Sequence, residues 1–282
     1  MRQEAYFCTV KELDELGKNN IPRQLISHTH LIYSSPATLA FNSPGAEGFG
    51  VKRAGLAVPD SVMLIVSPGC CGRNTSVLSS MRAYQDRFYY LLMDETDIVT
   101  GRHLKKIPKA VAEICEGLKK KPSVVMICIT CVDALLGTDM ERVCHKAEEY
   151  AGVPVRPCYM YALTREGRKP PMVHVRQSVY SLLEPKKKKG NVVNLLGYFS
   201  PLTDDCELYD LLHGAGVKTI HEISRCKDYA QYQTMSEANF NLVLHPEARF
   251  AAEDFHDRLK IPYIELRRLY QIDKIASQYR AL

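Results

Sequence analysis

The sequence predicts an α/β protein with two Rossmann-like domains, each built on a parallel sheet. Short apolar runs typical of buried strands alternate with stretches in which apolar residues recur every three or four positions, as on one face of a helix. Strands separated by helices of this length are typical of parallel βαβ units. The alternation stops at the lysine run 186–189, between Pro185 and Gly190, and then restarts. We therefore expect one domain over residues 1–185 and a smaller one over residues 190–282.

Length and composition narrow the class of protein. The chain has 282 residues, of which 46% are hydrophobic, which is enough for one large or two medium cores. Its longest apolar runs are about six residues, against the roughly 20 that a membrane-spanning helix needs. The polar start, Met1 to Glu4, lacks the apolar core of a signal peptide, so we expect a cytoplasmic protein with no membrane partner. A net charge of +5 without interleaved aromatic and basic residues argues against a nucleic-acid partner.

The first domain is expected to contain strand-like runs separated by amphipathic helices. The expected strands are residues 62–66, 88–92, 124–127 and a short extended segment at 153–157, whose prolines suit a sheet edge. A helix is predicted over 104–118 by apolar residues spaced three and four apart. A second helix is predicted to begin at a capping-box pattern that starts at Thr138 and to end at Gly152.

The second domain repeats the same pattern on a smaller scale. Its expected strands are residues 192–197, 217–220, 240–244 and 263–265, with helices around 208–212 and over 250–259. No glycine-rich phosphate loop follows these strands, so the usual modes of dinucleotide and nucleoside triphosphate binding are not expected. The lysine run that precedes this domain is interpreted as a solvated linker, with docking of an acidic partner as the alternative.

Two cysteines follow buried strands directly. Cys71 lies in the loop after residues 62–66, and Cys131 follows residues 124–127. The carboxyl ends of parallel strands are where open α/β sheets bind ligands, so these thiols favour a metal or redox site. Cys70 is a further candidate ligand beside Cys71. Cys128 and Cys131 could instead form half of a zinc site or a redox pair, although Cys128 within an apolar run is also typical of a buried small hydrophobe.

An ordered set of segments resembles the nitrogenase component 1 family. The segment Asp60 to Gly72 is similar to that family's D-x-x-x-x-x-H-G-P-x-G-C pattern. Residues 97–102 are similar to its D-(I/V)-V-x-G-G turn, and residues 130–139 are similar to its T-C-x-x-x-(L/I)-I-G-D-D segment. Residues 191–197 and 240–247 resemble its middle domain. The resemblance covers nearly all of the chain beyond about residue 40, and the third domain of the family would begin near Leu282.

The resemblance implies an iron–sulfur component of a multi-subunit reductase. Relatives reduce dinitrogen, a tetrapyrrole ring or a nickel tetrapyrrole precursor, and receive electrons from a separate ATP-dependent iron protein. Cys71 and Cys131 match two cluster ligands of the family. The third ligand falls at Ala46, and the histidine of the H-G-P element is replaced by Val66 or Ser67.

Two thiols in each chain are half of what a four-iron cluster requires. We therefore expect a 4Fe-4S cluster shared across a two-fold dimer or with a paralogous subunit. His245 falls at or beside the position of a middle-domain cofactor ligand, which leaves room for a second metallocofactor, or it is a histidine that starts a helix. The alternatives for the whole chain are a non-catalytic scaffold for metallocofactor assembly, or a small-molecule-binding module without a cluster.

Three arginines lie in loops near the expected strand ends. Arg73, Arg102 and Arg225 are candidates for binding an anionic substrate, because guanidinium groups bind carboxylates and phosphates well. The remaining cysteines receive no role.

Overall fold

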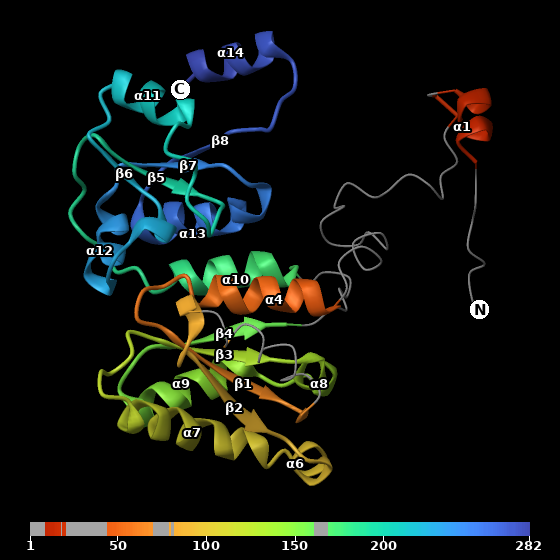
Figure 1. The fold of residues 1–282 in the computed structure, drawn as a ribbon, viewed down its shortest axis with the longest axis vertical. Helices are drawn as coiled ribbons and strands as arrows, with labels where there is room; N and C mark the ends of the chain where they lie inside the picture. The colour runs from red at the N-terminus through yellow and green to blue at the C-terminus, as the bar shows by residue number, and fades with distance from the viewer. Residues whose placement is uncertain (1–8, 18, 21–43, 70–78, 80–81, 161–168) are drawn as a thin grey trace.

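The computed structural model describes residues 9–17, 19–20, 44–69, 79, 82–160 and 169–282. Within them the chain forms two four-stranded sheets in which every pairing of neighbouring strands is parallel (Figure 1). The α/β class with two parallel sheets is therefore confirmed. Helix α1 (Val10–Leu16) lies near the start of the described residues.

The first sheet has the strand order β2-β1-β3-β4. Its strands are β1 (Val62–Ser67), β2 (Phe88–Leu92), β3 (Val125–Ile129) and β4 (Val155–Tyr159). The helical segments around it are α4 (Pro44–Gly55), η2 (Arg82–Tyr84), α6 (Glu95–Thr100), α7 (His103–Gly117), α8 (Cys131–Leu136), α9 (Met140–Ala151) and α10 (Pro171–Tyr180).

Alternation along the strands supplies both faces of this sheet with apolar side chains. Val62, Leu64 and Val66 pack in one core cluster with residues of α7 and α9. Met63 and Ile65 belong to a second cluster, which includes residues of α4 and α10. The sheet therefore lies between two helical layers, as Figure 1 shows. Pro157 lies on β4, at the edge of the sheet, where the missing amide hydrogen is tolerated.

The second sheet has the strand order β6-β5-β7-β8. Its strands are β5 (Val192–Leu196), β6 (Thr219–His221), β7 (Phe240–Val243) and β8 (Tyr263–Glu265). Its helical segments are α11 (Glu207–Gly214), η3 (Ile223–Arg225), α12 (Tyr229–Gln233), η4 (Thr234–Glu237), η5 (Pro246–Ala248), α13 (Arg249–Leu259) and α14 (Ile272–Arg280).

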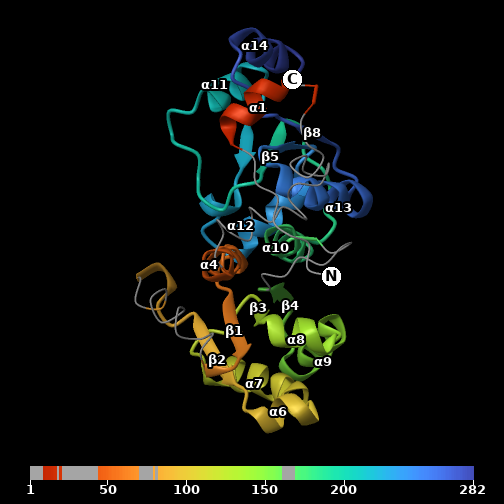
Figure 2. The same ribbon diagram turned by 90° about the vertical axis from the view of Figure 1, so that its right-hand side faces the viewer.

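Helix α10 packs against both halves of the molecule. It contacts α4 and β4 on one side and α13 and η5 on the other, and it lies at the junction of the two halves in both views (Figures 1 and 2). The rings of Tyr180 and Phe255 meet edge to face with centroids 5.3 Å apart. The hydroxyl of Tyr232 donates to the Val179 carbonyl, and Arg258 donates to the Tyr180 carbonyl at 2.9 Å. One core cluster thus contains side chains from both halves, and the division into domains at residues 185 and 190 stays a prediction.

The lysine run is exposed at Lys186, Lys187 and Lys189, as the linker interpretation expects. It is nevertheless held against the second half. Lys188 Nζ donates to the carbonyl oxygen of Ser236 at 2.7 Å, and Lys189 forms an ion pair with Glu237. Backbone and side-chain contacts to η4 therefore fix the path of this segment.

Candidate functional site

The carboxyl ends of β1 and β3 lie side by side in the first sheet. The register pairs Val66 with Ile129, so Ser67 and Thr130 occupy equivalent positions where the strands end. Thr130 precedes α8, and Cys131 is the first residue of that helix. Of Cys131 only the backbone is described, and Cys70 and Cys71 lie outside the described residues. Ala46, at the position of the family's third ligand, lies in α4.

Three polar atoms at these strand ends are buried without a hydrogen-bond partner in the described part of the chain. They are Ser67 Oγ, Thr130 Oγ1 and Asp133 Oδ2. Buried polar groups nearly always have a partner, so a concentration of unpaired oxygens at one strand edge is unusual. This edge of the sheet is therefore a polar site rather than a continuation of the apolar core.

A buried histidine and carboxylate form the centre of this edge. His103 Nε2 lies 2.9 Å from Asp133 Oδ1, and His103 Nδ1 lies 3.0 Å from the carbonyl oxygen of Asp97. A carbonyl only accepts, so Nδ1 must carry a hydrogen. Nε2 and Asp133 must then share one further proton, either as imidazolium and carboxylate or as neutral imidazole and carboxylic acid. Asp133 Oδ1 also accepts from the hydroxyl of Thr138 at 2.9 Å.

Asp97 links this pair to exposed cations. It belongs to a capping box with Asp94 at the start of α6, and its carboxylate accepts from Arg102 Nε at 2.6 Å and Lys106 Nζ at 2.8 Å. These two cations, with Lys106 making the larger contribution, hold the pKa of the buried Asp97 carboxyl well below its usual range. The network fixes the loop before α7, and hence the position of His103.

His245 lies at the carboxyl end of β7 in the second sheet. Its Nδ1 accepts from the backbone N–H of Glu247 at 3.3 Å, so it caps η5. The rings of His245 and Tyr198 pack edge to face, with centroids 5.7 Å apart. Burial, with help from Arg176 and Arg268, lowers the pKa of His245, whereas Glu247 opposes that shift. The structure thus places His245 where a helix begins, and its role as a ligand stays a prediction.

A buried ion pair fills the space beside His245. Arg176 of α10 donates to the carbonyl of Gly197 at 2.7 Å and 3.2 Å, to the carbonyl of Met172 at 2.8 Å, and to Glu247 at 2.8 Å. Gly197 has φ of +140°, and a Cβ there would come within 2.7 Å of the His245 backbone nitrogen. The ends of β5 and β7 are therefore in close contact and are joined to α10.

The arginines expected to bind an anionic substrate are already paired where the structure describes them. Arg102 binds Asp97 and Asp94, and Arg225 binds Glu222 and Asp204. Arg73 lies outside the described residues. Neighbouring carboxylates already pair with Arg102 and Arg225, and a role of these two arginines in binding an anionic substrate stays a prediction.

The geometry of both sheets agrees with comparisons to known proteins. The sequence profile of the nitrogenase component 1 type oxidoreductases matches residues 47–282. The chain belongs to this family. A solved structure described as "Nitrogenase Cp1 at pH 6.5" superposes with a TM-score of 0.61 over 82% of this chain and 56% of that one, at 17% sequence identity, which supports the fold alone.

Curated relatives of the family are similar over most of this chain. The nitrogenase iron-molybdenum cofactor biosynthesis protein NifE of Nostoc sp. is 27% identical over 225 residues, which are 77% of this chain and 46% of that protein. The NifE protein of Methanococcus maripaludis is 23% identical over 242 residues, 83% of this chain and 50% of that protein. The chain thus spans about half the length of the curated relatives it matches. Membership of the family implies binding of a metallocluster.

The described residues alone do not assemble a metal site. No group of three or more histidine, cysteine, aspartate or glutamate side chains among them is arranged to hold a metal ion. A cluster site in this family member would therefore need the Cys71 loop, the Cys131 thiol or a partner chain. None of the helices in the described segments combines the length and apolar character needed to cross a bilayer.

Proposed function

We propose that this chain is the iron–sulfur component of a nitrogenase-like multi-subunit reductase that accepts electrons from an ATP-dependent iron protein. Cys71 and Cys131 are its cluster ligands, with Cys70 as a further candidate. The observation that carries the proposal is the parallel pairing of β1 with β3. In the sequence, Cys71 follows the end of β1, and Cys131 follows the end of β3 as the first residue of α8, so both cysteines come after neighbouring strands.

The cluster is of the 4Fe-4S type and is shared between two chains. Four thiolates are the usual ligand set of such a cluster, and one chain offers two at this edge. Exposed apolar residues on β2, α6 and α8, most of them toward the carboxyl end of the first sheet, support a protein interface there. They are Tyr90, Leu92, Val99, Leu135 and Leu136. A second copy or a paralogous subunit would cover them and complete the ligand set.

Iron content and mutation of the cysteines test the cluster. We expect anaerobically purified protein to be brown, with about four irons per dimer, and Cys71→Ser or Cys131→Ser to lose the iron. Cys115→Ser is the matched control, since Cys115 lies on α7 away from the strand ends. Full iron retention in both ligand variants would overturn the assignment. A monomer that keeps its cluster would exclude the shared site.

A scaffold for metallocofactor assembly is the second candidate function. It is favoured by the similarity to proteins described as cofactor biosynthesis proteins, and by the absence of a cysteine at Ala46. Reduction of the cluster by the cognate iron protein, followed spectroscopically with and without ATP, separates the two. ATP-dependent reduction followed by turnover supports a reductase, whereas a cluster that is never reduced supports the scaffold. Iron-free protein would instead support a module without a cluster.

A further inference from the structure

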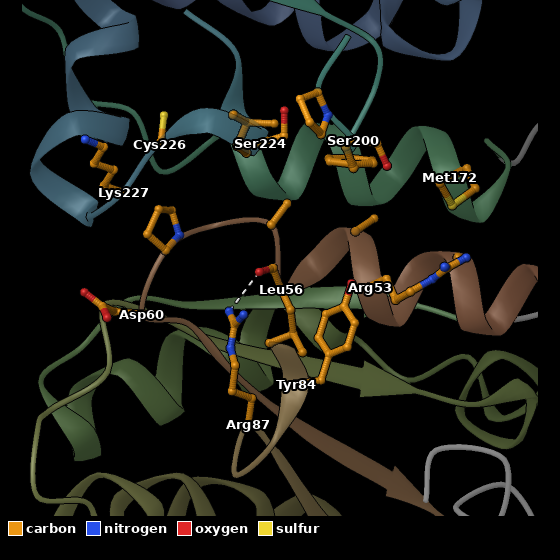
Figure 3. Close-up of a pocket in the computed structure, with 17 residues that line it drawn as sticks. Arg53, Leu56, Asp60, Tyr84, Arg87, Met172, Ser200, Ser224, Cys226 and Lys227 are labelled. Carbon is orange, nitrogen blue, oxygen red and sulfur yellow. Dashed lines mark hydrogen bonds between the residues drawn. The ribbon is translucent and has the colours of Figure 1, made fainter. Parts of the chain in front are cut away.

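A cleft of about 580 Å³ lies between the two halves, away from the strand ends that carry Cys131. Figure 3 shows its walls: the end of α4 and the segment leading to β1 on one side, and the loops after β5 and β6 on the other. Its volume is in the range of sites for small organic ligands. Apolar side chains form much of the wall, among them Leu56, Met172, Phe199 and Ile223.

Arg87 brings a partly buried positive charge to this cleft. Its Nε donates to the carbonyl of Ser61 at 2.9 Å, and its Nη2 donates to the carbonyl of Leu56 and the hydroxyl of Ser61, both at 2.8 Å. These partners are neutral, and within the described part of the chain Nη1 has no hydrogen-bond partner. Burial lowers the pKa of Arg87, whereas Tyr84 and Asp60 oppose that shift, and Arg87 forms no ion pair with a described residue. The guanidinium points toward the cleft in Figure 3.

Two further cations line the same cleft at its opposite ends. Arg53 lies at one end and Lys227 at the other, with Arg87 between them (Figure 3). Both side chains are exposed, and neither forms an ion pair with any described residue. Asp60 is the carboxylate in the lining, and Lys120 Nζ already pairs with it at 2.8 Å. The cleft therefore carries three separated positive charges around an apolar wall.

We propose that this cleft binds an organic polyanion, a small molecule with an apolar body and two or more separated carboxylate or phosphate groups. A compact inorganic anion would reach one of the cations and leave the apolar wall hydrated. A neutral apolar ligand would leave the Arg87 charge without a counter-ion. The hydroxyl groups of Tyr84 and Ser200 offer additional hydrogen bonds to the acid groups.

Calorimetry with a defined probe tests the proposal. We expect the full chain to bind benzene-1,3,5-tricarboxylate, and to bind neither inorganic phosphate nor the neutral 1,3,5-tris(hydroxymethyl)benzene at the same concentrations. Arg53→Gln and Lys227→Gln should each lower the affinity for the tricarboxylate roughly threefold to fivefold, because each removes one exposed charge. Arg87→Gln should weaken it at least about tenfold, because it removes a less solvated charge. Lys109→Gln, an exposed lysine of α7 outside the cleft, is the matched control and should not change the affinity.

Three results would overturn the proposal: no binding of the tricarboxylate, equal binding of the neutral triol or of phosphate, or unchanged affinity in both Arg53→Gln and Lys227→Gln. If Arg87→Gln fails to fold, the affinities of Arg53→Gln and Lys227→Gln still decide the test. Cys131→Ser should bind the probe as the wild type does, so the outcome is independent of whether a cluster is present.

Discussion

His103 Nε2 and Asp133 Oδ1 lie 2.9 Å apart, and both side chains are almost completely buried. They come from different elements, α7 and α8, so this contact joins two helices at the carboxyl end of the first sheet. One proton shared between the two groups keeps the pair neutral overall. Because Asp133 is two residues after Cys131, the contact also fixes the first turn of α8.

Loss of Asp133 should be strongly destabilising. In Asp133→Ala the buried His103 loses its partner, and we expect the free energy of unfolding to fall by roughly 3–5 kcal/mol, as when one member of a buried pair is removed. The double variant His103→Leu with Asp133→Leu should be more stable than Asp133→Ala, because neither ionisable member of the pair is left buried without the other, although Thr138 and the Asp97 carbonyl each lose one hydrogen bond. Urea unfolding measures both, with the exposed Asp257→Ala as control. A loss no larger than that of Asp257→Ala would contradict the importance of the pair.

Arg176 should be important for the attachment of the two halves. Arg176→Met removes bonds to two carbonyls and leaves Glu247 and the Gly197 carbonyl without their partner. We expect a loss of about 3 kcal/mol in the free energy of unfolding. Arg280→Met, on the exposed end of α14, should have little effect. Equal stability of the two variants would show that the buried pair contributes nothing measurable.

Two glycines separate backbone strain from steric overlap. Gly216 has φ of +92° with no atom near an added Cβ, so Gly216→Ala should cost about 1 kcal/mol from strain alone. Gly197→Ala adds an overlap with the His245 backbone and should cost at least roughly 2–3 kcal/mol. Thermal unfolding of the two variants compares these costs. If Gly197→Ala costs no more than Gly216→Ala, then β5 and β7 can move apart without loss of stability.

Stability should fall in mild acid because of His221. Burial lowers the pKa of this side chain below its usual 6.5, with Lys189 acting in the same direction and Glu237 against it. The unfolded chain therefore takes up the proton first, so this contribution is fully present above about pH 6.5 and is lost as the pH falls through the folded pKa. His221→Gln should reduce the difference in stability between pH 7.5 and pH 5.5. His145→Gln, on the exposed face of α9, should keep the wild-type difference.

The strands were the most predictable part of the fold. Residues 263–265 and 88–92 have the predicted bounds, because short apolar runs ending in turn residues have few alternatives as buried parallel strands. Helices α4 and α10 were not predicted. Both helices pack against more than one element, so their apolar residues are not confined to one face. The 3.6-residue spacing of apolar positions that identifies an amphipathic helix is therefore weak in these segments. The predicted capping pattern at Thr138 is displaced by one residue, since Asp139 caps α9 and Thr138 binds Asp133.

The polar network at the strand ends was not predicted as a unit. His103 begins the apolar stripe of α7, four residues before Ile107 and eight before Val111, and a histidine in such a stripe could have been noted as buried. Its partner Asp133 is distant in sequence, so only the fold brings the two together. Arg102 and Thr138 stand where the family patterns have glycine and aspartate, and both bind carboxylates of this network. The ligand roles of Cys71, Cys131 and His245 stay predictions.

The position of α10 between the two halves has a consequence for synthesis. When Tyr180 leaves the ribosome, the partners that cover it, such as Phe255 on α13, have not yet been made. At about 5–20 residues per second, translation needs several seconds to reach Leu259. During that interval the apolar side chains of α10 that later pack against α13 are exposed and can contact other nascent chains. Slow translation through residues 181–259 should therefore increase the demand for chaperones more than a similar delay after Leu259.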